Sequence, residues 1–188
     1  MECFKNFAAL IIDMDGVLWH GERPVEGLQA FFRVLREQNK RFILATNNAS
    51  LTAEQYLVKL DRMGVEIHLN EVLTSAMATA CYLAEQVDAK KTRVFVLGEE
   101  GASQPLRDQG FFLTDLYEVD PDNKADIVVC GKDETITWDK LATATLNIRA
   151  GAKFFGTNGD ITLPTERGLI LGNGAILAAL ETATGVKP

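Results

Sequence analysis

The chain has few residues of the kinds that mark specialised classes of protein. Its 188 residues include three cysteines, five prolines and two histidines, and its longest unbroken apolar runs, such as Phe7–Ile12, have six residues. Spanning a bilayer takes about 20 apolar residues, so a membrane-spanning helix is not expected. Cys3, Cys81 and Cys130 are odd in number, lie far apart and form no C-x-x-C pair. A disulfide scaffold or zinc ribbon is therefore not expected.

Positive charge is also scarce. The 19 Lys and Arg residues are outnumbered by 26 Asp and Glu residues, which gives a net charge of −7. Such a chain is a poor general binder of nucleic acid or anionic membranes, and neither is expected as a partner. The N-terminus lacks the basic head and long apolar stretch of a signal peptide. We therefore expect a reduced, cytoplasmic protein.

What the chain does contain is a regular alternation of strand and helix patterns. Its hydrophobic content of 47% and charged content of 24% are ordinary globular values. Strands are predicted at Ala8–Ile12, Arg41–Ala45, Val72–Thr74, Arg93–Leu97, Asp126–Cys130 and Lys153–Phe155. Helices are predicted at 27–38, 52–63, 76–86, 101–109, 138–149 and 173–184, with Ser75 and Asn173 as N-caps. This pattern predicts an α/β fold with a parallel sheet, and the polar segment 87–92 is the candidate boundary between two units.

Two acids directly follow the first predicted strand, in Asp13-Met14-Asp15-Gly16. Ligands of parallel α/β sheets bind outside the carboxyl ends of the strands. One carboxylate can attack a phosphorus atom and form an aspartyl-phosphate. The other can protonate the leaving oxygen and then activate water. Because the acids and the phosphate are all anionic, a metal ion is needed between them, and Mg²⁺ fits because it favours oxygen ligands.

The same residues have a simpler interpretation. Asp-Gly after a strand is a common turn, and on the residues alone both readings stay open. A calcium loop of the EF-hand type is excluded, because it requires an acid or amide at the position that Val17 occupies.

A second polar group, Thr46-Asn47-Asn48, follows the second predicted strand. A hydroxyl and two amides at a neighbouring strand end can bind phosphate oxygens without adding negative charge. Asn and Ser are also frequent in loops that lead into a helix, so the tripeptide by itself is nonspecific. Its value lies in its position beside the two acids.

Together these stretches resemble the haloacid dehalogenase-like hydrolases. IIDMDGVLWHGERP around Asp13 is similar to the family's first motif and ATNNAS (Ala45–Ser50) to its second. FFGTNGDITLPTERGLILGNGAILAALETATG (Phe154–Gly185) resembles the cap and post-cap region of the subgroup that contains para-nitrophenyl, nucleotide and sugar-phosphate phosphatases. The resemblance implies a doubly wound, Rossmann-like core with an inserted α/β cap. Residues 1–86 would form the first part of the core, 87–171 the cap, and 172–188 a return helix.

The resemblance also implies roles for individual residues. Asp13 would be the nucleophile and a Mg²⁺ ligand, and Asp15 the general acid and base, with its backbone carbonyl on the metal. Thr46, helped by Asn47 and Asn48, would hold the transferring phosphoryl group of a small phosphorylated metabolite. The loop 157–164 would face the leaving group.

Two features of the family are not found. The family uses a lysine in a Gly-Lys-Pro sequence and an acid in a later Gly-Asp segment. Lys187-Pro188 follows a helix directly, so we read Lys187 as a linker rather than as that lysine. The C-terminal part of the core is therefore expected to be missing, and the chain alone to be a poor phosphatase.

Two other functions are weighed against a phosphatase. The first is a truncated, non-catalytic module that binds a phosphate or a partner. The second is a phospho-accepting receiver domain, which the second α/β unit argues against.

Phe7–Ile12 lacks polar alternation, which predicts a strand covered on both faces. With one edge of this strand open, self-association is expected and a homo-oligomer stays open.

Overall fold

The computed structural model describes residues 7–165 and 167–188, so Cys3 lies outside the described residues. The chain divides into two compact units. The first contains residues 7–46 and Ala53–Leu73, and the second contains Asn47–Thr52 and Thr74–Pro188. The fold is α/β with parallel sheets, as predicted. The division at 86 and 171 stays a prediction, and helix α3 (Ser75–Gln86) is grouped with the second unit.

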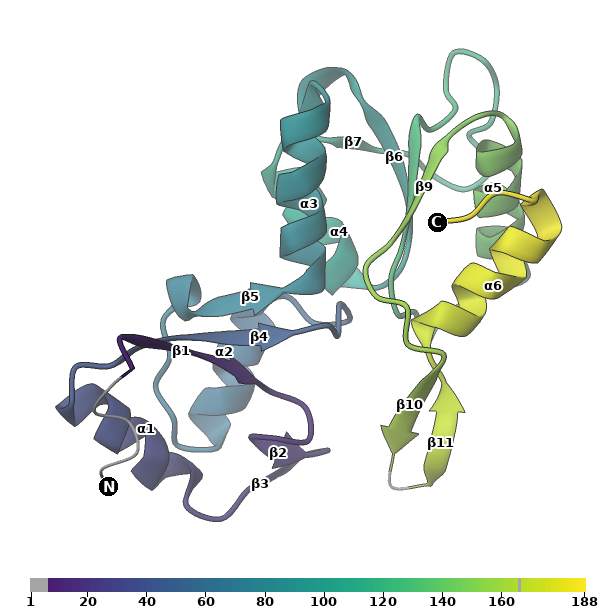
Figure 1. Ribbon diagram of the computed structural model, residues 1–188. Coiled ribbons are helices and arrows are strands. Elements are labelled where there is room, and N and C mark those ends of the chain that lie inside the picture. Colours follow the sequence, from purple (N-terminus) through teal and green to yellow (C-terminus); the bar gives the residue numbers. More distant parts are fainter. Residues whose placement is uncertain (1–6, 166) are drawn as a thin grey trace. The chain divides into compact units, whose positions relative to one another are not determined.

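The first unit is built on a three-stranded sheet in the order β1-β4-β5. These strands are β1 (Ala9–Asp13), β4 (Arg41–Thr46) and β5 (Val72–Thr74). Strands β1 and β4 pair in parallel, with Ala9 opposite Arg41 and Asp13 opposite Ala45. The connecting helices are α1 (Leu28–Glu37) and α2 (Ala53–Arg62), and in Figure 1 both lie below the sheet.

Burial on this sheet is one-sided. Ile12 in β1 is 8% exposed, whereas its neighbour Ile11 is 82% exposed. Phe42 and Leu44 of β4 are buried, and the ring of Phe42 meets that of Phe32 from α1 at 5.3 Å between centroids. The prediction that the first strand is covered on both faces is therefore wrong, because the described helices cover one face only. Within the described residues β1 also ends the sheet, which agrees with the expected open edge.

The second unit has a four-stranded parallel sheet in the order β7-β6-β8-β9. Its strands are β6 (Arg93–Leu97), β7 (Phe112–Leu113), β8 (Ile127–Cys130) and β9 (Lys153–Gly156). Helices α3 and α4 (Glu100–Asp108) lie on one side of the sheet, and α5 (Trp138–Arg149) and α6 (Asn173–Thr184) lie on the other (Figure 1). Every residue of β8 is buried. Val128 and Cys130 belong to one core cluster, and Ile127 and Val129 to another.

The short segment 47–52 packs against the start of α4. The amide of Gly101 donates to the carbonyl of Ser50 at 3.1 Å. A Cβ atom at Gly101 would lie 2.4 Å from the carbonyl oxygen of Leu51, so only glycine permits this approach. The segment that follows β4 therefore belongs to the core of the second unit.

Two predicted helix caps are wrong by one residue. Thr74, not Ser75, caps α3, because its hydroxyl accepts from the amide of Met77 at 3.2 Å. Gly172, not Asn173, precedes α6, and it makes no side-chain cap. Asn173 turns inward instead, since it is 3% exposed.

Two antiparallel hairpins were not predicted. They are formed by β2 (Trp19–His20) with β3 (Arg23–Pro24), and by β10 (Thr162–Thr165) with β11 (Gly168–Leu171). Both involve strands of two to four residues, which are too short to show a hydrophobic period. No helix in the described part of the chain has the length and apolar content needed to cross a membrane.

Opposite faces of β1 should respond differently to mutation. Ile12→Ala should lower the free energy of unfolding by about 2–5 kcal/mol, because it leaves a cavity in a packed core. Ile11→Ala should change it by less than about 0.5 kcal/mol. Urea unfolding, followed by the fluorescence of Trp19 in a Trp138→Phe background, measures the free energy of unfolding of the first unit. Equal losses for the two variants would show that both faces of β1 are covered in solution.

The outer edge of β1 should be visible in hydrogen exchange. Amides along 8–12 should exchange faster than those of β8, which is paired on both sides. An open edge also favours pairing between chains, so apparent mass should rise with protein concentration. A monodisperse monomer with slow exchange along β1 would contradict both expectations.

Candidate active site

The two acids lie at the carboxyl end of β1, on a tight loop. Asp13 is the last residue of the strand and is exposed, and Met14 is fully buried. The amide of Leu18 donates to the carbonyl of Met14 at 2.9 Å, and the amide of Gly16 donates to the carbonyl of Trp19 at 2.8 Å. Gly16 has φ of +82°, a backbone conformation that favours glycine. The loop thus anchors Met14 in the core and presents an acid on either side of it.

The carboxylate of Asp15 accepts hydrogen bonds on both oxygens. The indole Nε1 of Trp19 donates to Oδ1 at 2.8 Å, and the hydroxyl of Thr46 lies 3.5 Å from Oδ2. The first distance is ordinary for an N–H donor, while the second is at the outer limit of a hydrogen bond. Thr46 reaches Asp15 because β1 and β4 are parallel neighbours whose carboxyl ends share one edge.

Tyr56 of α2 closes the buried side of this group. Its ring stacks on Trp19 with 6.3 Å between the centroids, and its hydroxyl is hydrogen-bonded with that of Thr46. Burial first, and then the charge of Asp15, raise the pKa of Tyr56 well above its usual value, although the bond with Thr46 acts in the opposite direction. Tyr56 therefore stays protonated and neutral at physiological pH.

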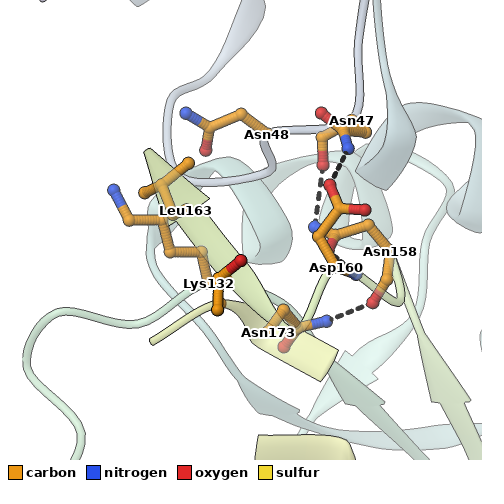
Figure 2. A pocket seen from close by; sticks show the side chains of 9 residues that line it. Asn47, Asn48, Lys132, Asn158, Asp160, Leu163 and Asn173 are labelled. Atoms are coloured by element: carbon orange, nitrogen blue, oxygen red, sulfur yellow. Dashed lines mark hydrogen bonds between the residues drawn. The ribbon is translucent and has the colours of Figure 1, made fainter. Parts of the chain in front are cut away.

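Asn47 and Asn48 continue the chain directly after Thr46 but belong to the second unit. The side chain of Asn47 donates to Asp160, and its carbonyl accepts from Asn158 Nδ2 at 2.9 Å (Figure 2). The same carbonyl accepts from the hydroxyl of Ser75 at 2.8 Å. Asn47 is thus bound to the loop that precedes β10.

Asn47 and Asn48 line a small pocket of the second unit. Four of its nine lining residues are asparagines, and Lys132 supplies one positive charge, with its Nζ 2.6 Å from Glu134. The lining residues are Asn47, Asn48, Lys132, Asn158, Asp160, Thr162, Leu163, Gly172 and Asn173. Asn48 also serves the loop itself, because its Oδ1 accepts from the amide and hydroxyl of Ser50 at 3.1 and 2.8 Å.

Asn173 holds the base of the pocket together. Its Nδ2 donates to the carbonyl of Cys130 at 3.1 Å and to that of Asn158 at 2.8 Å, and its Oδ1 lies 3.2 Å from the sulfur of Cys130 (Figure 2 shows the bond to Asn158). Burial raises the pKa of the Cys130 thiol to about 12, and the charge of Asp133 adds to this. Cys130 is therefore a neutral packing residue.

The structure therefore groups the predicted site residues in two sets. Asp13, Asp15 and Thr46 meet at one sheet edge of the first unit, while Asn47 and Asn48 line the pocket of the second. Their roles in catalysis and binding stay predictions. Trp19, which contacts this group, is fully buried.

The sequence held little signal for the partners of these residues. Trp19 lies four positions after Asp15, and only the tight loop at Gly16 brings the two together. Asn158 and Asp160 lie more than 100 residues from Asn47 in the sequence. Asn173 was named only as a helix cap.

Oxygen donors at the end of β1 suit a hard cation. Asp13 provides an exposed carboxylate, and the carboxylate of Asp15 is engaged by Trp19 and Thr46. No group of three or more His, Cys, Asp or Glu residues within 7–165 and 167–188 could hold a metal alone. Mg²⁺ is usually bound by one or two carboxylates with waters and substrate phosphates, so this donor set fits it.

Comparison with known proteins agrees with the sequence resemblance. The profile of the haloacid dehalogenase-like hydrolases matches residues 10–112. An acid sugar phosphatase of Staphylococcus saprophyticus is 41% identical over 184 residues, which are 98% of this chain and 68% of that protein. The 5'-nucleotidase YutF of Bacillus subtilis is 40% identical with the same coverage. The structure of glycerol phosphate phosphatase of Mycobacterium tuberculosis in complex with magnesium matches with a TM-score of 0.85 at 38% identity. The match covers 96% of this chain and 53% of that chain.

The chain belongs to the haloacid dehalogenase-like hydrolase family. By this family resemblance it is a phosphoric monoester hydrolase. The family predicted from the two motifs and the later Phe154–Gly185 stretch is thereby confirmed.

Removing the amide of Asn173 should destabilise the second unit. Asn173→Ala removes the donor to the carbonyl of Asn158 and one of two donors to that of Cys130, which still accepts from the amide of Thr157 at 2.9 Å. We expect a total cost of about 1–3 kcal/mol. Thr182→Ala, at an exposed position of the same helix, is the control and should stay within about 0.5 kcal/mol of wild type. Thermal unfolding by circular dichroism measures both. A wild-type midpoint for Asn173→Ala would mean that the buried network does not form in solution.

Proposed function

We propose that the protein is a Mg²⁺-dependent phosphatase of small phosphomonoesters, with Asp13 as nucleophile and Asp15 as general acid and base. The observation that carries this proposal is the meeting of Asp13, Asp15 and Thr46 at one sheet edge, with the Asp15 carboxylate bound by Thr46 and Trp19. The exposed Asp13 can be reached by a substrate. The named phosphatases among its relatives favour catalysis over a non-catalytic binding module.

In the first step, an oxygen of Asp13 attacks phosphorus and forms an aspartyl-phosphate. The bond from phosphorus to the ester oxygen breaks, and the proton of Asp15 passes to that oxygen, which leaves as an alcohol. The hydroxyl of Thr46 lies at the same edge and would bind a phosphoryl oxygen. Asp13 and the main chain of Asp15 would hold Mg²⁺, which neutralises negative charge on the phosphoryl oxygens when bound.

In the second step, Asp15 acts as a base. It takes a proton from water as the water oxygen attacks phosphorus. The bond between phosphorus and Asp13 then breaks, which releases inorganic phosphate and restores the carboxylate. One residue can serve in both directions because it leaves the first step in the ionised form that the second step needs.

The substrates that we propose are sugar phosphates or nucleotides. Relatives named for a sugar phosphate and for a nucleotide support this choice. Within the second unit, the pocket lined by four asparagines offers donors and acceptors that can bind hydroxyl groups.

Asp13 should carry the covalent intermediate. Incubated with Mg²⁺ and para-nitrophenyl phosphate, the wild type should form an acid-stable, hydroxylamine-sensitive phosphoprotein. Asp13→Asn should abolish both labelling and turnover, because an amide is not a nucleophile for phosphorus. Quenched-flow labelling followed by peptide mapping measures the modified residue.

Asp15→Asn provides the matched control. It keeps the nucleophile, and the aryl leaving group departs with little protonation, so labelling should persist while release of phosphate slows by about 10²–10⁴-fold. Normal turnover by Asp13→Asn, or a label on Asp15, would contradict the assignment.

A further inference from the structure

Trp19 holds the carboxylate of Asp15 in one orientation. Its Nε1 lies 2.8 Å from Oδ1, whereas the hydroxyl of Thr46 lies 3.5 Å from Oδ2. An indole N–H can only donate, so Oδ1 accepts from it whether the carboxyl group is protonated or not. A hydroxyl can donate or accept, so Thr46 is compatible with a proton on Oδ2. The two oxygens of Asp15 are therefore not equivalent.

The indole is itself fixed by its surroundings. Trp19 has no exposed surface, and its ring stacks on Tyr56 at 6.3 Å. Nζ of Lys59 lies 4.7 Å from the centre of the ring. Lys59 also donates to the carbonyl of Gly21 at 3.0 Å and pairs with Glu22 at 3.2 Å, which binds α2 to the β2–β3 hairpin. The N–H therefore has little freedom to follow a rotation of Asp15.

We propose that Trp19 is the positioning residue for Asp15, which it orients so that Oδ2 carries the transferable proton. This inference rests on the proposed function. In the first step the proton leaves Oδ2 for the ester oxygen as the P–O bond breaks. In the second step the same oxygen receives a proton from the attacking water. Trp19 touches neither substrate nor phosphorus and acts through Asp15 alone.

The leaving group reveals whether the proton is well placed. An alkyl oxygen is a strong base and must be protonated as it departs, whereas para-nitrophenolate departs with little help. The value of kcat/KM reports the steps up to formation of the aspartyl-phosphate. Loss of the Trp19 N–H should therefore lower kcat/KM for an alkyl ester more than for the aryl ester. A general fault in folding or phosphate binding would lower both equally.

The test compares Trp19→Phe with Trp138→Phe. Phenylalanine keeps an aromatic ring for Tyr56 and Lys59 but removes the donor, while Trp138 is 82% exposed and lies in the second unit. If Trp19→Phe folds poorly, benzothienylalanine at position 19, in the Trp138→Phe background, replaces the N–H by sulfur at nearly constant shape. We expect kcat/KM for glycerol phosphate to fall about tenfold more than that for para-nitrophenyl phosphate. Trp138→Phe should leave the ratio of the two unchanged.

The hydrogen bond between Trp19 and Asp15 can also be tested by a measurement that does not depend on activity. In ¹H–¹⁵N spectra of the full chain, Asp15→Ala should move the indole proton resonance of Trp19 upfield, since a bond to a carboxylate is lost, and should leave that of Trp138 in place. An unmoved Trp19 resonance, or equal losses of kcat/KM for the two esters, would overturn the positioning role. A wild type that forms no aspartyl-phosphate and hydrolyses neither ester would instead overturn the proposed function, and this inference with it.

Discussion

The parallel pairing of β1 with β4 is the interaction on which the first unit and its site depend. In the register of this pair Asp13 lies opposite Ala45, so the residues that follow each strand lie at the same edge of the sheet. Parallel strands require a crossover connection, and α1 provides it while burying Phe32 and Leu35 against one face of the sheet. A shift of register by one residue would turn Ile12 outward and Ile11 inward, and would carry Asp13 away from Thr46. The same apolar contacts that fix the register thus fix the site.

The two sheets differ in how they are covered. The four-stranded sheet has helices on both faces, and β8 is buried throughout, as expected of a central parallel strand. On the described three-stranded sheet one face is covered, and Ile11 and Leu73 are exposed on β1 and β5. Burial of apolar surface is the main favourable term in folding, so the first unit gains less of it for each strand. The two acids of the proposed site therefore lie on the less extensively buried sheet.

The order of elements could be predicted from the sequence because it depends on local patterns. Apolar runs and caps located the six helices named in the sequence analysis and the strands β1, β4, β5, β6, β8 and β9 within a residue or two. The two polar groups after the first strands predicted a shared edge. The coverage of β1 could not be predicted in this way. An unbroken apolar run has the same appearance whether one or both faces are packed, and Ile11 and Ile12 are alike in sequence but opposite in burial. The contacts of Trp19 and Asn173 could not be predicted from local patterns either. Each depends on a partner that the side chain meets only after the chain has folded back.

The placement of 47–52 in the second unit has a consequence for the order in which the chain can fold during synthesis. Residues of the first unit have all been made once Leu73 is added, but Ser50 and Leu51 must wait for Gly101, about 50 residues after them. At roughly 5–20 residues per second, translation imposes a delay of several seconds. Asn47 waits longer still, for Asn158 and Asp160. The nascent chain therefore completes the strands of the first unit well before it can complete the pocket of the second.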